Sequence, residues 1–352
     1  MRIEQHLTAF LQDRSRLDVP GNALLVRHGD SELYRHFSGT ADEGTLWRIY
    51  SMTKVVTVTA ALQLYEHGMY DIDDPLGDYL PEYAHPMVWD EERKTAVPAL
   101  NKLRIRDLFC MSSGLPYGGS DFETARQVGQ KTAALEALHP GQGYSTLQLV
   151  RALGDVPLAF EPGTRWMYGM SHDVLGGLIE VLSGLTLGEY MRQNIFEPLG
   201  MHDTFFRCPE GQESRLADFP TGERQAANFR PTARYEAGGG GLLSTIDDYM
   251  KLASCLTRGG TSAEGVRILS RKTIDLLRMD QLNDVQKADF NWAYLKGYSY
   301  GLGVRTLVDP AAAGIPGSVG EFGWCGVMGT WVLMDPAEGL TAVYMHQRMP
   351  NL

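Results

Sequence analysis

The chain contains few cysteines, and their spacing suits neither a metal site nor a disulfide framework. Four cysteines occur among 352 residues, at positions 110, 208, 255 and 325, and no two of them form a Cys-x-x-Cys pair. Zinc sites and small disulfide-rich domains need closer and more regular spacing. We therefore expect free thiols, as in a reducing cytosol.

The chain also lacks any run of lysine or arginine. Acidic residues outnumber basic ones by 43 to 32, and the net charge is -11 at pH 7. An acidic protein repels the phosphate backbone, so we expect no nucleic-acid partner.

No stretch is apolar enough for a signal peptide core or a membrane span. Residues 1–11 instead resemble an amphipathic helix, with Ile3, Leu7, Phe10 and Leu11 on one side. We expect a cytoplasmic protein without a membrane partner, although a leader removed earlier is compatible with this sequence. Hydrophobic residues make up 43% of the chain, enough for a large core in one large domain or two units.

Strand patterns occur near both ends of the chain, and helical patterns lie between them. Strands are expected at 22–30, 32–39, 299–307, 331–334 and 340–347, and helices at 52–67, 146–153, 173–183 and 246–256. This order predicts an α+β (mixed α/β) protein with an antiparallel sheet flanked by helices. One lobe would comprise residues 1–70 and 230–352, and a mostly helical lobe residues 71–229, with the active site in the cleft between them. The sequence leaves the oligomeric state open.

A serine and a lysine lie three residues apart at the start of the helix predicted over 52–67. Ser51 and Lys54 would share one face of this helix, which we expect to be buried along one side. The lysine amine can accept the serine proton if burial or a neighbouring cation lowers its pKa. Ser-x-x-Lys alone is a weak signal, because it occurs by chance in many proteins.

Two later stretches offer groups that such a nucleophile needs, residues 161–176 and residues 321–331. A proton carrier and an oxyanion hole must complete the site. The glycines at 238–241 precede a helix, and we interpret them as backbone packed closely against another segment.

With these motifs in place, the chain resembles the penicillin-recognising serine hydrolases, the group of class C β-lactamases, D,D-peptidases and family VIII carboxylesterases. The matching pieces cover nearly the whole chain: Ser51-Met52-Thr53-Lys54, Ser113-Gly114-Leu115, Pro162-Gly163 with Trp166-Met167-Tyr168, Gly238 to Thr245, and Phe322 to Trp331. The resemblance implies a β-lactamase/transpeptidase-like fold. It also implies an enzyme that needs neither metal nor organic cofactor.

The resemblance further implies roles for individual residues. Ser51 would be the acylated nucleophile, Lys54 its proton partner, and Tyr168 a phenolate or strongly polarised phenol that shuttles protons. The backbone N–H groups of Ser51 and Val327 would form the oxyanion hole. Without the resemblance, Tyr168 would be interpreted as a core aromatic residue.

The departures from the family pattern concern substrate binding. Met170 stands at the asparagine of the Tyr-x-Asn element, and Trp324-Cys325-Gly326 stands at the Lys-Thr-Gly element. We expect these residues, together with Tyr117, to line the substrate pocket. Such a pocket favours neutral, apolar acyl groups over an anionic β-lactam or a D-Ala-D-Ala terminus. Trp-x-Gly resembles the esterase branch, and residues 168–173 also resemble the statin-type acyltransferases and esterases.

We therefore predict a serine hydrolase that cleaves small-molecule carboxylic esters, with or without acyl transfer to alcohols. Two alternatives stay open: a β-lactamase or D,D-peptidase, and a non-catalytic binding protein that keeps the fold. His172 is interpreted as a structural or surface histidine, and Cys325 as a small filler.

Overall fold

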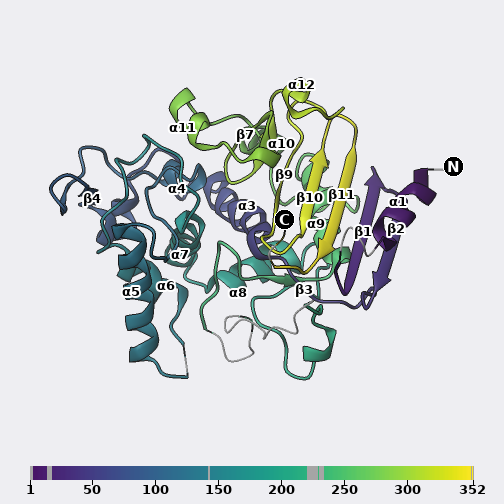
Figure 1. Ribbon diagram of the computed structural model, residues 1–352, viewed down its shortest axis with the longest axis horizontal. Coiled ribbons are helices and arrows are strands. Elements are labelled where there is room, and N and C mark those ends of the chain that lie inside the picture. Colours follow the sequence, from purple (N-terminus) through teal and green to yellow (C-terminus); the bar gives the residue numbers. More distant parts are fainter. Residues whose placement is uncertain are drawn as a thin grey trace.

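The computed structural model describes residues 3–13, 18–141, 143–219, 229, 234–349 and 351. Its main sheet has seven antiparallel strands in the order β2-β1-β11-β10-β9-β8-β7 (Figure 1). These strands are β1 Gly21–His28, β2 Ser31–Gly39, β7 Tyr298–Tyr300, β8 Arg305–Leu307, β9 Phe322–Cys325, β10 Trp331–Asp335 and β11 Leu340–His346. The N-terminal hairpin pairs with the last strand, which puts Asn22 opposite His346. The predicted sheet built from both ends of the chain is confirmed.

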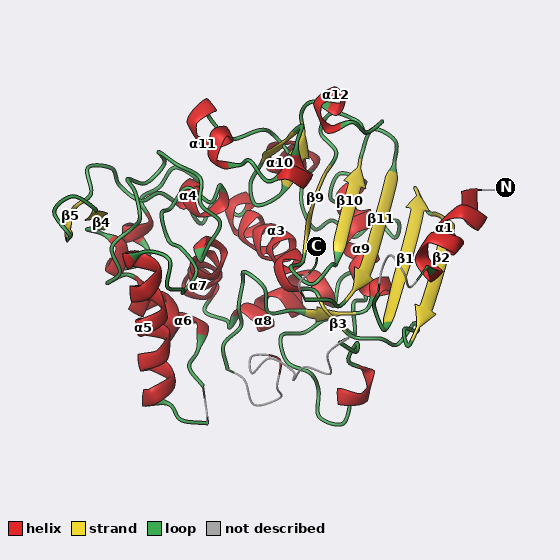
Figure 2. Cartoon of the chain, in the orientation of Figure 1, coloured by secondary structure: helices red, strands yellow, loops and turns green. Residues whose placement is uncertain are grey.

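Some helices pack against this sheet, and others form a separate group away from it (Figure 2). They are α1 Ile3–Gln12, α3 Thr53–Glu66, α4 Ile105–Phe109, α5 Glu123–Leu138, α6 Thr146–Leu153, α7 Ser171–Ser183, α8 Leu187–Met191, α9 Ile246–Thr257, α10 Arg271–Leu277, α11 Asp284–Asp289 and α12 Pro310–Ala313. Two small antiparallel pairs complete the strands, β3 Trp47–Arg48 with β6 Leu243–Ser244 and β4 Met87–Asp90 with β5 Thr95–Pro98. Helix α9 packs on β1, β10 and β11, whereas α4, α5, α6 and α7 lie away from the sheet. The exact lobe boundaries stay a prediction, and the expected boundary at residue 230 falls outside the described residues.

Helix α3 is buried on all sides, so the expectation of burial along one side is wrong. Every residue from Thr53 to Leu64 is buried. The polar side is covered because it binds the turn at Gly238–Gly241: the Thr57 hydroxyl donates to the Gly238 carbonyl at 2.7 Å. Helix α3 is rich in β-branched residues, which are weak helix formers, so tertiary packing stabilises it more than local propensity.

The single strand predicted over 299–307 is also wrong. The structure has two short strands, β7 and β8, joined by a turn in which Gly303 adopts φ = +83°. A Cβ atom at Gly301 would lie 2.3 Å from the Leu277 carbonyl oxygen. Gly301 and Gly303 therefore interrupt the alternating pattern of residues 299–307 and permit a tight, closely packed turn there.

Within the described residues, no single helix is long and apolar enough to cross a membrane. One pair, Ser171–Ser183 with Leu187–Phe196, meets the criterion together but is bent by 75°.

Candidate active site

Ser51 lies in a 3-10 turn, Tyr50–Met52, that leads directly into α3. The serine thus precedes the α-helix, whereas Lys54 lies in its first turn, and the two side chains still share one face. Lys54 Nζ is 3.2 Å from Ser51 Oγ. Tyr50 adopts φ = +44°, a conformation that costs a non-glycine residue of the order of 1 kcal/mol. Such local strain is common where a fold fixes a functional side chain.

The amine of Lys54 is fully buried and makes three polar contacts. Besides Ser51, it donates to the Gly239 carbonyl oxygen at 2.5 Å and to the Tyr117 hydroxyl at 2.9 Å. Burial lowers the pKa of Lys54 to about 7, and the nearby Asp173 carboxylate opposes that shift. A large fraction of Lys54 is therefore a free amine near neutral pH, as a proton acceptor requires.

Tyr117 comes from the loop after Ser113-Gly114-Leu115 and contacts Lys54 directly. The sequence had placed it only in the wall of the pocket. Burial raises the pKa of its phenol well above the ordinary value. Tyr117 therefore stays protonated beside Lys54.

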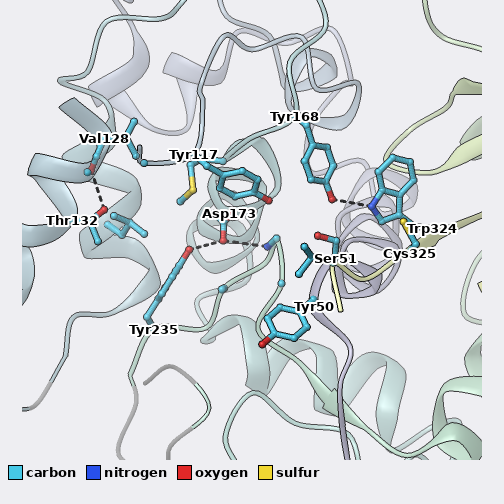
Figure 3. Close-up of a pocket in the computed structure, with 18 of the residues that line it drawn as sticks. Tyr50, Ser51, Tyr117, Val128, Thr132, Tyr168, Asp173, Tyr235, Trp324 and Cys325 are labelled. Carbon is cyan, nitrogen blue, oxygen red and sulfur yellow. Dashed lines mark hydrogen bonds between the residues drawn. The ribbon is translucent and has the colours of Figure 1, made fainter. Parts of the chain in front are cut away.

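Tyr168 lies beside the Ser51–Lys54 pair as a phenol, one of its two predicted forms. Lys54 Nζ lies over the face of its ring, 4.5 Å from the centroid, and the hydroxyl accepts a hydrogen bond from Trp324 Nε1 at 2.8 Å (Figure 3). A hydrogen bond with Ser51 favours the phenolate, but burial is the larger effect and raises the pKa of Tyr168. Of the two predicted forms, the phenolate is wrong, because desolvation of the anion exceeds the effect of its hydrogen bonds with Ser51 and Trp324, and the neutral phenol remains.

Asp173 and Tyr235 complete a polar layer that sequence reasoning missed. The Tyr235 hydroxyl donates to Asp173 Oδ1 at 2.5 Å, and the Gly239 N–H donates to the same oxygen at 3.2 Å. Burial raises the pKa of Asp173, whereas Lys54 and these hydrogen bonds lower it. Hydrogen bonds thus connect Asp173 with Lys54 Nζ through the backbone N–H and carbonyl groups of Gly239.

The turn at Gly238–Gly241 can bind Lys54 because it has no side chains. A Cβ atom at Gly238 would lie 2.4 Å from the His172 carbonyl oxygen, and one at Gly239 would lie 2.4 Å from Asp173 Oδ2. The predicted close packing of this run is confirmed. The sequence signalled these two residues only by position. Asp173 lies in the matched stretch after Tyr168, and Tyr235 lies just before the glycines at 238–241.

His172, in the first turn of α7, is structural. It is fully buried, its Nε2 is 3.3 Å from the Phe109 carbonyl oxygen, and burial lowers the pKa of its imidazole to about 3. It does not line the cavity beside Ser51.

The second group of predicted site residues lies on strand β9 and just after it, near Ser51. Trp324 and Cys325 line the cavity, and Val327, which is 52% exposed, lies just after the strand and also lines it. Burial raises the pKa of the Cys325 thiol, which keeps it protonated. Gly326 does not line the cavity: a Cβ there would meet Thr330 Oγ1 at 2.2 Å and the Ile49 carbonyl oxygen at 2.6 Å.

The cavity beside Ser51 has a volume of about 830 Å³, within the range of small-molecule sites. Met170 and Tyr117 line it as predicted. It extends from the aromatic residues Tyr168, Trp292, Tyr294 and Trp324 to one face of α5. Trp292, Tyr294 and the α5 residues were missed, because no local motif links them to Ser51.

No group of three or more His, Cys, Asp or Glu side chains in the described ranges could hold a metal ion. All four cysteines are free, which confirms the expectation of free thiols.

Comparisons with known proteins agree with this geometry. Protein Rv1367c of Mycobacterium tuberculosis (strain ATCC 25618 / H37Rv) is 33% identical over 325 residues, covering 88% of this chain and 79% of that protein. Esterase EstB of Burkholderia gladioli is 29% identical over 364 residues, covering 94% and 86%. The structure of simvastatin synthase (LovD) from Aspergillus terreus matches with a TM-score of 0.79 and 23% identity, over 99% of this chain and 94% of that one.

These likenesses confirm the predicted β-lactamase/transpeptidase-like fold and the resemblance to serine hydrolases of the esterase branch. The model of the family described as Beta-lactamase matches residues 3–352. The match covers almost the entire chain and includes every residue of the site, so the chain belongs to the β-lactamase family.

Proposed function

We propose that this chain hydrolyses carboxylic esters through an acyl-enzyme formed on Ser51. The contact between Ser51 Oγ and the buried amine of Lys54, at 3.2 Å, carries this proposal. Burial lowers the pKa of Lys54 to about 7, so the amine can act as general base near neutral pH.

In the first step, Lys54 accepts the proton of Ser51 while Oγ attacks the ester carbonyl carbon. The Oγ–carbon bond forms, and the carbonyl π electrons move onto oxygen. The tetrahedral intermediate then collapses, the carbon–oxygen bond to the alcohol breaks, and the departing oxygen takes the proton held by Lys54. The neutral hydroxyl of Tyr168 acts as a hydrogen-bond donor beside this leaving oxygen. Water repeats the sequence on the acyl-enzyme and releases the acid.

The backbone N–H groups of Ser51 and Val327 are the proposed oxyanion hole. Ser51 lies in the turn that leads into α3, Val327 follows the end of β9, and both residues line the same cavity. Backbone donors need no particular side chain, so a valine is acceptable at this position.

The substrate class follows from the side chains around Ser51. Met170 and Trp324 replace the polar groups with which β-lactamases and peptidases bind an amide or a carboxylate, and both are at most 8% exposed. A pocket of this kind gains affinity from apolar surface and does not compensate a buried carboxylate. EstB, an esterase by name, supports the same reaction, and a β-lactamase or D,D-peptidase activity is not favoured.

Transfer of the acyl group to an alcohol is the second candidate fate of the acyl-enzyme. The cavity of about 830 Å³ has apolar walls on two sides of Ser51, which leaves room for an acceptor alcohol in place of water. The fold shared with a protein named simvastatin synthase agrees with a synthetic use of this site.

We also propose a cytoplasmic location, which the four free thiols support. The absence of nucleic-acid and membrane partners stays a prediction, as does the small-molecule nature of the ester.

The test is an activity screen with p-nitrophenyl esters of varied acyl length and the β-lactam nitrocefin. We expect ester turnover that Ser51→Ala abolishes, together with weak or absent nitrocefin hydrolysis. Mass spectrometry of the acid-quenched enzyme should place the acyl group on Ser51. Efficient nitrocefin turnover would instead favour a β-lactamase, and failure of a fluorophosphonate to label Ser51 would favour a non-catalytic protein.

A further inference from the structure

The cavity extends in two directions from Ser51. Figure 3 shows Trp324 on one side of the serine, and Val128 and Thr132 on the opposite side beyond Tyr117 and Tyr235. An ester also has two substituents, one on each side of its carbonyl group. The geometry therefore raises the question of which substituent each arm of the cavity takes.

The arm away from Trp324 runs along one face of α5. Its lining residues on this helix are Val128, Gly129, Thr132, Ala133 and Glu136, whose spacing puts them in one stripe. The stripe is about 12 Å long, since Glu136 follows Val128 by eight helical steps of about 1.5 Å each. We call this part of the cavity the α5 arm.

Aromatic and apolar side chains form the opposite wall of the α5 arm. Tyr144, Leu149 and Tyr235 line it, and the rings of Tyr144 and Tyr235 are 5.5 Å apart. The hydroxyl of Thr132 donates to the Val128 carbonyl oxygen of its own helix at 3.0 Å, so it needs no partner from a ligand. The arm near Ser51 is thus suited to an aliphatic chain.

Gly129 keeps the α5 arm open. It lies inside a 16-residue helix and is not among the glycines with positive φ, so its backbone conformation does not require glycine. A Cβ atom there would meet only the Gly119 backbone nitrogen, at 3.9 Å. Glycine inside a helix destabilises that helix relative to alanine. At this position the missing side chain leaves space that a ligand can occupy.

The position of Tyr168 decides which substituent enters this arm. Its hydroxyl lies on the Trp324 side of Ser51, where it accepts the indole N–H. The leaving oxygen must lie beside this hydroxyl and the proton held by Lys54. The alcohol therefore faces Trp324, and the carbon chain of the acyl group points the other way.

Resting on the proposed function, we infer that the α5 arm binds the acyl chain of elongated aliphatic esters and that Gly129 determines the chain length accepted. The arm opens to solvent at Ala133 and Glu136, both exposed. A chain longer than the buried part of the arm thus leaves the protein there. The Glu136 carboxylate disfavours chains that end in a second carboxylate.

The experiment compares wild type, Gly129→Ala and Gly129→Leu on p-nitrophenyl acetate, butyrate, hexanoate and octanoate. Burying one methylene group contributes about a fourfold gain in kcat/KM, so wild type should improve with chain length. A leucine side chain displaces about three methylenes, so Gly129→Leu should lose roughly 50-fold on octanoate relative to acetate. Gly129→Ala should lie between the two. Alkyl acetates from ethyl to octyl, which vary only the alcohol, should keep their relative rates in all variants.

The matched control is Ala134→Val, on the same helix but outside the lining of the arm. It should keep the wild-type chain-length profile. An unchanged acyl profile in both Gly129 variants overturns the inference, and a changed alcohol profile with an unchanged acyl profile assigns the arm to the alcohol instead.

Labelling of Ser51 with methyl and octyl fluorophosphonates provides a readout that does not require turnover. Labelling of Gly129→Leu by the methyl probe at the wild-type rate shows a folded site, and slower labelling by the octyl probe supports the inference. A wild-type enzyme that hydrolyses no ester would refute the proposed function itself, whereas an esterase with a Gly129-independent profile would refute only the assignment of the arm.

Discussion

Two regions meet at Ser51 and differ in how their polar groups are satisfied. The polar floor comprises Lys54, Tyr117, Asp173, Tyr235 and the peptide at Gly239, joined by hydrogen bonds of 2.5 to 3.2 Å. The aromatic wall comprises Tyr168, Trp292, Tyr294 and Trp324, whose rings contact one another, with centroids of Tyr168 and Trp324 5.6 Å apart.

The difference separates the proton chemistry of the floor from the recognition surface of the wall, and only the Tyr168 hydroxyl belongs to both. In the floor, burial and partners fix the protonation of each group, so the base strength of Lys54 is built into the fold. The wall offers an approaching substrate mostly carbon surface. Apolar walls discriminate by shape and distinguish similar alcohol groups only weakly, so we expect a broad range of neutral esters.

The largest effect should come from removing the nucleophile where the two regions meet. Ser51→Ala should lower kcat/KM for p-nitrophenyl butyrate by about 10⁴-fold or more, because covalent catalysis is lost. Ser113→Ala, another buried serine, is the control. Activity of Ser51→Ala above 1% of wild type would exclude Ser51 as the nucleophile.

Removing the amine tests whether the floor supplies the base. Lys54→Met should lower kcat by about 10²- to 10⁴-fold, the usual contribution of general acid–base catalysis. Steady-state kinetics with p-nitrophenyl butyrate measures this effect. If fluorophosphonate labels Lys54→Met as fast as wild type, the base lies elsewhere.

A smaller effect is expected from the wall. Trp324→Phe removes the indole N–H that binds the Tyr168 hydroxyl but keeps an aromatic ring. One net hydrogen bond is worth about 0.5–1.5 kcal/mol, so kcat should fall by up to about tenfold without new nitrocefin activity. Trp292→Phe, in the same wall, should have less effect on kcat. A loss as large as that of Lys54→Met would mean that the wall takes part in the chemistry.

The smallest change should be a shift in the pH dependence. Lys54 must be neutral to accept a proton, and its pKa is about 7, so kcat/KM should rise with pH, reach half of its plateau near pH 7 and level off above that. The Asp173 carboxylate raises the pKa of Lys54, so Asp173→Asn should move this rise to lower pH. Asparagine can still accept the hydrogen bonds from Tyr235 and Gly239, and Tyr235→Phe is the comparison that keeps the charge. A shift to higher pH in Asp173→Asn would contradict this assignment.

The sequence by itself determined the local features of the site. The spacing of Ser51 and Lys54 sufficed to put both on one face, even though the serine lies in a 3-10 turn. The replacement of polar motif residues by Met170 and Trp324 indicates an apolar pocket from the sequence alone. Such features depend on near neighbours in the chain or on the chemistry of single side chains.

The tertiary structure decided which distant groups surround them. Tyr117 binds Lys54 from 63 residues away, and the peptide at Gly239 does so from 185 residues away. The α5 arm belongs to no motif, and burial decided in favour of the phenol, one of the two forms expected for Tyr168. The protonation state of a group and the shape of a cavity depend on all the atoms packed around them. They therefore cannot be predicted from the order of residues along the chain.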